Sequence, residues 1–345
     1  MNAWRNPGVV AAIGAAALFG AGTPFAKLLL GPVSPWLLAG LLYLGSGAGL
    51  AIMRRIRRTQ PVKLARGEAK WLAGAIVAGG VVGPVLLMWG LSRLPASTAS
   101  LMLNAEGVFT ALLAWFVFRE NFDRRIAFGM ALIVAGAVAL AWPGEAESAA
   151  GLPALAVLGA CFAWALDNNL TRKVSLADAT FIAMAKGLAA GLVNVAIAFL
   201  LGAHLPSLPV VVGAAVLGFV SYGLSLVLFV VALRHLGTAR TGAYFSTAPF
   251  VGALIAVPLL SESMTVSLMV GGALMAAGVW LHLTEHHGHP HAHKSLGHEH
   301  EHVHDEHHRH MHAGSGSEPH AHWHEHEPMT HSHEHYPDAH HRHGH

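Results

Sequence analysis

Long apolar stretches, separated by short polar or Pro/Gly breaks, recur along the first 284 residues of the chain. Each stretch is near 20 residues, the length that an α-helix needs to cross a hydrocarbon core of about 30 Å. The apolarity is continuous rather than alternating, which favours membrane helices over the strands of a barrel. The pattern predicts an all-α integral membrane protein with ten spans, at about 8–30, 34–53, 70–92, 96–118, 125–142, 152–172, 178–201, 208–233, 238–260 and 264–284.

Basic residues mark alternate connections between these spans. Fifteen of them, from Arg5 to Arg240, fall at one side of the predicted membrane, whereas Lys27 and Arg93 fall near the other side. Short loops rich in Lys and Arg stay in the cytoplasm. The charges therefore predict a multi-pass protein of the cell inner (plasma) membrane with its N- and C-termini in the cytoplasm.

The composition changes completely after residue 284. Of the 27 histidines, 24 lie in the segment 285–345, mostly in His-x-His alternation, with acidic residues, Gly and Pro between them. Such a segment lacks the aliphatic residues of a packed core, so we expect it to be disordered. Imidazoles suit Zn²⁺, Ni²⁺ and Co²⁺, so the tail is predicted to bind these divalent ions through its histidines. The proposed ligands are His298, His300, His302, His304, His307, His308, His320, His322, His324, His326, His331, His333 and His335.

An internal repeat links the two halves of the apolar region. A shift of 142 residues places Glu120 on Glu262, and Gly129 and Gly136 on Gly271 and Gly278. Five spans per repeat is an odd number, so the second copy is expected to cross the membrane upside down. Inverted repeats of this kind are typical of secondary transporters, which alternate between two equivalent packings.

The repeated segments also carry a family resemblance. Leu94-Pro95-Ala96-Ser97 and Arg119-Glu120 in the first half, with Leu236-Gly237-Thr238-Ala239, Pro249 and Ser261-Glu262 in the second, resemble EamA-type transporters of the drug/metabolite transporter superfamily. The resemblance implies a first five-helix repeat over 1–148, a second over 149–284, and a separate tail over 285–345. It also implies an exporter of amino acids or other small metabolites; the His-rich tail is not a general family feature.

Charged and polar residues within the spans are the candidate substrate or coupling site. A charge near mid-bilayer costs roughly 2.5–3.5 kcal/mol, so it persists where it is paired, faces a cavity or is used. Glu106 lies beside Asn104 near the centre of span 4, and we predict that it takes part in coupling or recognition, with a structural salt bridge as the alternative. Gly107 and Pro249, at corresponding places in the two halves, are the predicted hinge points.

Span 6 ends in three adjacent polar residues, Asp167, Asn168 and Asn169, of which one or two should face the bundle. Asp167 is predicted to pair with Lys186, as a structural ion pair or as part of a cytoplasmic gate. Trp164 and Tyr244 lie deep enough to line a pocket, with core packing as the alternative. Lys27 is expected to snorkel to the interface, and Glu262 to make structural contacts with a neighbouring loop.

These features predict a secondary transporter, not an enzyme, that exports small metabolites by alternating access and needs no cofactor for transport. Divalent metal efflux, with the tail as a cytoplasmic buffer or sensor, is the main alternative, and a membrane-tethered metal-binding protein is a weaker one. The expected partners are a small-molecule substrate, membrane lipid and divalent metal ions at the tail, with no nucleic acid, in a monomer or homodimer. The single cysteine, Cys161, excludes an intramolecular disulfide.

Overall fold

The structure is a computed structural model of the whole chain. It describes residues 7–31, 33–59, 67–118, 124–141, 151–171, 174, 178–283, 288–293, 296–302, 320–326 and 329–334. Internal contacts divide the chain into two units, Met1–Glu285 and His286–His345.

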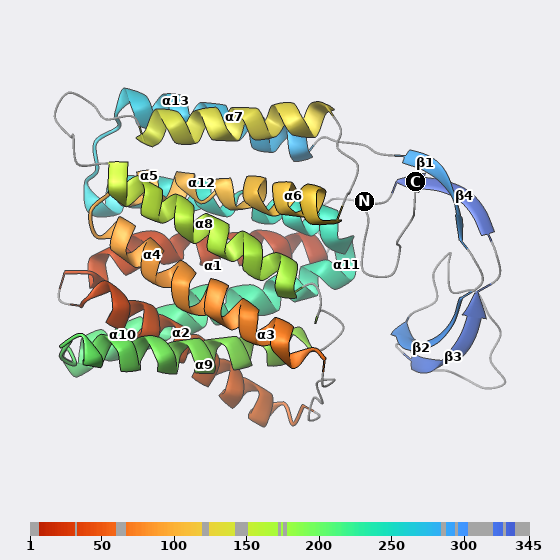
Figure 1. Cartoon of the computed structure of the whole chain (residues 1–345), viewed down its shortest axis with the longest axis horizontal. Helices are drawn as coiled ribbons and strands as arrows, with labels where there is room; N and C mark the ends of the chain where they lie inside the picture. Colours follow the sequence, from red (N-terminus) through yellow and green to blue (C-terminus); the bar gives the residue numbers. More distant parts are fainter. Residues whose placement is uncertain are drawn as a thin grey trace. The chain divides into compact units, whose positions relative to one another are not determined.

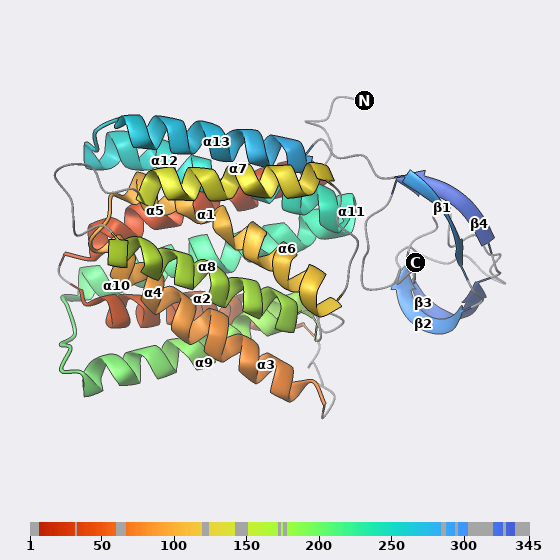
Figure 2. The ribbon, with the colours of Figure 1, turned by 45° about the horizontal axis from the view of Figure 1, so that its top comes forward.

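The first unit is helical, and its helices lie side by side along one common direction (Figures 1 and 2). Six of the described helices are long and apolar enough to cross a membrane, and three more apolar helices are shorter. The elements are α1 (Pro7–Leu29), α2 (Pro35–Ile56), α3 (Ala69–Ala75), η2 (Ile76–Val82), α4 (Gly83–Leu91), α5 (Ala96–Met102), α6 (Ala105–Phe118), α7 (Arg124–Ala141), α8 (Gly151–Thr171), α9 (Ala179–Leu200), α10 (Leu208–Gly218), η4 (Phe219–Leu224), α11 (Ser225–Phe245), α12 (Ala248–Leu260) and α13 (Val266–Leu283).

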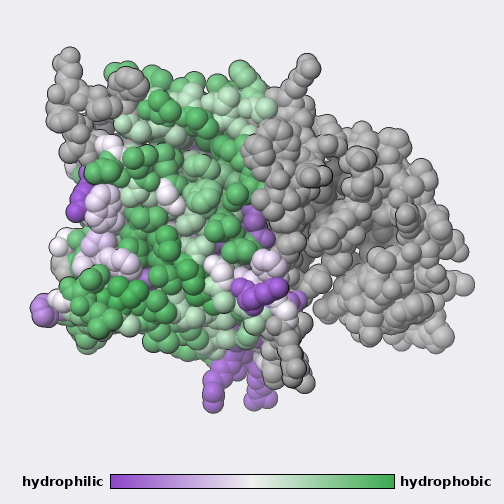
Figure 3. All heavy atoms as spheres, in the orientation of Figure 1, coloured by the Kyte–Doolittle hydropathy of each residue, from purple (hydrophilic) through white to green (hydrophobic). Residues whose placement is uncertain are grey.

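The outer face of this unit is apolar. In Figure 3 green atoms cover most of the visible side of the helices, and purple atoms gather towards the helix ends. Large aliphatic side chains are exposed on several helices, among them Ile56, Leu152, Leu200 and Leu254. Exposed apolar area of this extent marks a surface that contacts lipid or another protein. It agrees with the membrane protein that the apolar stretches of the sequence predict.

Two helix boundaries differ from the sequence prediction. The predicted loop between spans 8 and 9, at 234–237, lies inside α11, and the turn falls instead at Ser246–Thr247. Pro249 therefore does not break a helix, because it stands in the first turn of α12, where a missing N–H costs nothing. In the first half the equivalent turn, at Leu103–Asn104, separates α5 from α6.

Helices α7 and α13 pack along their length, and they are related by the same 142-residue shift, which carries Arg124–Ala141 onto Val266–Leu283. A Cβ on Gly136 would lie 2.8 Å from the carbonyl oxygen of Gly271, and one on Gly278 would lie 2.5 Å from that of Gly129. Only glycine allows the two backbones to come this close. Because the earlier glycine of each helix faces the later glycine of the other, the two helices are antiparallel.

Local irregularities also occur at corresponding places. The π-helical segment η2 lies between α3 and α4 and η4 lies between α10 and α11, and the shift of 142 residues superposes the two segments to within one residue. Helix α8 packs against η2, α4 and α6, whereas its counterpart α1 packs against η4, α11 and α12. Sequence-equivalent helices thus have equivalent neighbours.

The backbone of the second unit differs from the disordered tail that the composition predicts. It contains four short strands, β1 (Gly288–His293), β2 (Leu296–His302), β3 (His320–His326) and β4 (Met329–Glu334). Antiparallel pairing joins β1 to β4 and β2 to β3. The His-x-His alternation has the two-residue period of a strand, which is a local preference that a composition argument does not register. His304, His307, His308 and His335 lie outside the described residues.

Candidate functional site

A buried ion pair joins α8 to α9, each of which packs against η2. The ammonium of Lys186 donates to both carboxylate oxygens of Asp167, each at 2.6 Å, and the Thr171 hydroxyl donates to Oδ1 of Asp167 at 2.8 Å. Asp167 is 5% exposed. The pairing that the sequence predicts is therefore confirmed. Asp167 and Thr171 are one helical turn apart on α8, so both face the same ammonium.

The neighbouring residue, Asn168, turns to another helix. Its amide donates to Oε1 of Glu106 at 2.8 Å and lies 3.5 Å from the hydroxyl of Thr110. Glu106 and Thr110 are one turn apart on α6, and Glu106 lies in its first turn. Asn168 is exposed and Glu106 is half-buried. Among the described residues no cationic side chain forms an ion pair with Glu106.

The π-helical segment η2 supplies the third part of this polar region. In η2 each backbone N–H donates to the carbonyl five residues earlier, as the Gly83 N–H does to the Ala78 carbonyl. The carbonyls that follow Ala78 accept hydrogen bonds from side chains. The Gly79 carbonyl accepts from the Tyr43 hydroxyl at 2.8 Å and from the indole of Trp164 at 2.9 Å, while the Gly80 carbonyl accepts from Asn194 at 3.0 Å. Short π segments often mark functional sites in helices.

Glycine at position 79 is required by this arrangement. A Cβ there would overlap the carboxylate of Asp167, so η2 and the ion pair are in direct contact. We call this group of bonded polar residues the central polar cluster. Its members are Glu106, Thr110, Asp167, Asn168, Thr171 and Lys186, together with the Gly79 and Gly80 carbonyls and the donors to those carbonyls, Tyr43, Trp164 and Asn194. Four of its members, Tyr43, Thr110, Thr171 and the Gly79–Gly80 backbone, were not singled out by the sequence.

Three residues of the predicted site are not brought into this cluster. Asn104 donates to the Leu101 carbonyl at 3.0 Å, and Asn169 donates to the Ala165 carbonyl of its own helix at 2.9 Å. Tyr244 packs against a small apolar cluster of α1 and α11. Of the predicted hinge points, Gly107 is exposed in the first turn of α6 and Pro249 is buried in that of α12.

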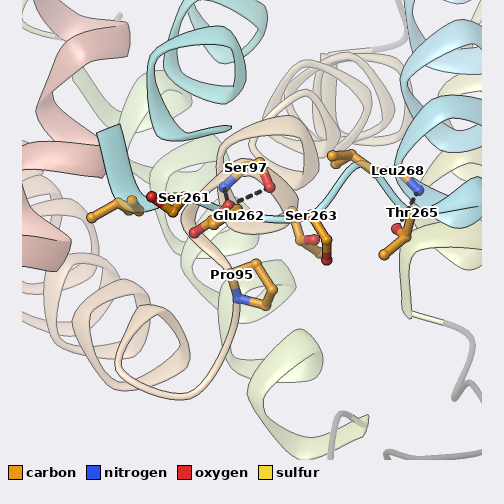
Figure 4. A pocket seen from close by; sticks show the side chains of 9 residues that line it. Pro95, Ser97, Ser261, Glu262, Ser263, Thr265 and Leu268 are labelled. Carbon is orange, nitrogen blue, oxygen red and sulfur yellow. Dashed lines mark hydrogen bonds between the residues drawn. The ribbon is translucent and has the colours of Figure 1, made fainter. Parts of the chain in front are cut away.

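A second polar site lies at the start of α5. The carboxylate of Glu262 accepts from the Ala96 N–H at 2.6 Å, and from the Ser97 N–H and hydroxyl at 2.9 and 2.5 Å. It thereby caps the free N–H groups of a helix N-terminus. A cavity of about 300 Å³ adjoins this contact (Figure 4). Its lining residues are Pro95, Ser97, Thr98, Leu260, Ser261, Glu262, Ser263, Thr265 and Leu268.

Lys27 is half-buried and contacts the end of another helix. Its ammonium donates to the carbonyl oxygens of Leu91 and Leu94, at the end of α4. These carbonyls have no partner within the helix, and a cation at a helix C-terminus is favoured by the helix dipole. Lys27 therefore joins α1 to the end of α4 by hydrogen bonds.

The comparisons with known proteins place this fold in a family. The EamA-like transporter family matches residues 6–142 and again residues 151–284, so the chain belongs to this family of membrane transporters. A solved structure, titled only as the crystal structure of a protein, covers 79% of this chain and 95% of its own length with a TM-score of 0.59 and 18% identity, which shows the fold alone.

Several curated relatives are named as transporters. A protein of Methanothermobacter thermautotrophicus, called an uncharacterized transporter, is 28% identical over 79% of this chain and 85% of its own length. A probable amino-acid metabolite efflux pump of Salmonella typhimurium is 26% identical over 55% of this chain and 68% of its own. A probable terminal-alkyne amino-acid exporter of Streptantibioticus cattleyicolor is 30% identical over 57% and 67%, respectively.

Proposed function

We propose that this protein exports amino acids or related small metabolites across the inner membrane, as a secondary transporter with cytoplasmic termini. The names of two relatives support the substrate class, and the distribution of Lys and Arg along the sequence supports the orientation. Transport needs no bound cofactor in this proposal, and a proton gradient or substrate exchange supplies the driving force.

Alternating access of two inverted halves is the proposed mechanism. The antiparallel packing of the equivalent helices α7 and α13, the matching helix breaks before α6 and α12, and the matching π segments η2 and η4 support it. Two halves with equivalent neighbours can exchange conformations, so that a central site opens to one side and then to the other.

Glu106 is the residue on which the proposal rests. It lies directly after the break between α5 and α6, is half-buried, and is held by the neutral donor Asn168. The other carboxylate nearby, Asp167, is already neutralised by Lys186. A half-buried carboxylate without a fixed cation is relieved by binding either a proton or a substrate amino group. Glu106 is therefore proposed to alternate between these two, which couples proton entry to export.

A matched set of variants tests this assignment. In proteoliposomes with an imposed pH gradient, Glu106→Gln should reduce proton-driven amino-acid flux at least tenfold, since the amide keeps the size of the side chain and removes its charge. Asn168→Ala should also reduce flux, because it removes the donor to Glu106, whereas Asn169→Ala removes an amide that bonds only its own helix and should leave flux near the wild-type value.

The same vesicles decide between the two candidate substrate classes. Loading them with Zn²⁺, Ni²⁺ or Co²⁺ in place of amino acids measures metal flux directly. Metal flux without amino-acid flux would overturn the proposal in favour of metal efflux. Full proton-driven flux in the Glu106→Gln variant would remove Glu106 from the coupling role but leave the substrate class standing.

A further inference from the structure

The histidines of the tail are in register across its strands. In the β2–β3 ribbon, His298 lies opposite His324, His300 opposite His322, and His302 opposite His320. The β1–β4 ribbon repeats the arrangement, with His289 opposite His333 and His291 opposite His331. Because histidine alternates with other residues in these strands, a register of one parity places histidine opposite histidine on every second rung, and the backbone has this register in both ribbons.

Strand geometry places these positions close together. Positions two apart on a strand share one face and are separated by roughly 6–7 Å, and positions directly opposite in an antiparallel pair are separated by about 4.5–5.5 Å. Two adjacent rungs therefore put four histidine positions on one face, within a rectangle of about 5 by 7 Å. Imidazole ligands hold Zn²⁺ at about 2.0–2.1 Å, four at a time in a tetrahedron, and two pairs of facing histidines supply that number.

We propose that the β2–β3 ribbon is a binding site for one divalent cation of the Zn²⁺, Ni²⁺ and Co²⁺ class, centred on the rung His300–His322. With one neighbouring rung of the same face, His298–His324 or His302–His320, it offers four histidine positions. The central rung belongs to both possible sets of four, so the site depends on it. The proposal goes beyond the export function and does not depend on it, because it concerns only the unit His286–His345.

A bound ion would also stabilise so small a ribbon. A two-stranded hairpin is marginal in water, and the strands β2 and β3 have seven residues each. A cation shared between the strands joins them as a cross-link, and its binding energy becomes folding energy of the ribbon. Metal addition should therefore increase the strand content of the tail as well as occupy the site.

A substitution that keeps the composition tests the register. In the full-length protein, His300→Glu with Glu301→His and His322→Ala with Ala321→His move the central rung to the opposite face, since positions 301 and 321 are paired, and the number of histidines and the net charge stay the same. The remaining rungs, His298–His324 and His302–His320, are then roughly 13 Å apart along the strands and cannot share an ion. Titration calorimetry on the purified protein at pH 7.5 should then show one tight Zn²⁺ site fewer than in the wild type, because the β1–β4 ribbon keeps its own two histidine rungs.

The matched control exchanges neighbours outside the strands. His304→Asp with Asp305→His and His308→Arg with Arg309→His also preserve composition, and these positions lie in 303–319, outside the described residues. This variant should keep the wild-type number of tight Zn²⁺ sites. The same number of tight sites in all three proteins would show that histidine content alone binds the metal and would overturn the ribbon site, and so would an equal loss in both variants. Because the readout is metal binding, its failure is distinguishable from a failure of the export proposal.

Discussion

Replacement of Lys186 by methionine should destabilise the helical unit strongly, because it leaves Asp167 as a buried charge. The aliphatic part of the side chain is conserved by Lys186→Met, and both ammonium contacts at 2.6 Å are lost. After the change Asp167 keeps the Thr171 hydroxyl as a donor, which satisfies one of its two oxygens.

The magnitude follows from the geometry of the pair. Two unit charges 2.6 Å apart attract by about 6 kcal/mol at an effective dielectric constant near 20. Burial of the two ions opposes this by several kcal/mol for each, so the intact pair adds little net stability. Removal of one partner, by contrast, leaves the burial cost of the other uncompensated, and such losses amount to about 3–5 kcal/mol.

Thermal unfolding of the purified protein in detergent measures the effect. Lys186→Met should lower Tm by roughly 6 °C or more, and the double variant Lys186→Met/Asp167→Leu should recover most of the loss because no unpaired charge remains. A single variant with a Tm within about 1 °C of wild type would refute the account. So would a double variant less stable than the single one, since the charge would then not be the cause.

Three further outcomes are expected. Glu262→Gln should lower the free energy of unfolding by about 0.5–2 kcal/mol, as the loss of a helix cap does. Thermal unfolding of this variant measures the effect, and Ser263→Ala, which leaves the cap intact, is the control. Gly136→Leu should separate α7 from α13 and lower both Tm and yield, whereas Gly107→Leu, where a Cβ meets nothing within 4 Å, should do neither through packing. At Asp178, burial acts to raise the pKa, but the hydrogen bonds from Arg54 and from the Phe181 and Thr180 N–H groups lower the pKa below its usual 3.8 overall. The stabilisation by the ionised Asp178 is therefore complete above pH 3.8 and is lost as the pH falls through the lowered pKa of the folded state. The Tm difference between the wild type and Asp178→Asn should accordingly be constant from pH 5 to 8 and should shrink below pH 3.8.

The sequence predicted two particular contacts from the type and position of the residues along the chain. The pairing of Asp167 with Lys186 follows because each is a charge in an apolar helix that needs a partner, and few were available. The structural role of Glu262 follows from its place at a helix end. The sequence did not predict the contact of Lys27, because the carbonyls of Leu91 and Leu94 that bind it are distant in sequence, and nothing local to Lys27 indicates them.

The break between the eighth and ninth spans was also misplaced. Arg234, Gly237 and Arg240 made 234–237 a reasonable loop, but α11 continues to Phe245. Propensity is a weak guide where neighbouring helices decide the path, and α11 packs against α1. In the tail, composition suggested disorder, whereas the alternation of histidine with other residues has the period of the strands that the backbone forms.

The sequence by itself determined the membrane character and the polar residues that a buried site requires, because apolar length and charge are properties of the chain. Only the tertiary structure decided which partner each of those residues binds. Asp167, Asn168 and Asn169 are adjacent, but the helix turns about 100° between them, so they meet Lys186, Glu106 and their own backbone, respectively. Which neighbour each one meets depends on the packing of α6 and η2 against α8 and of α9 against η2, and no local pattern in the sequence specifies that packing.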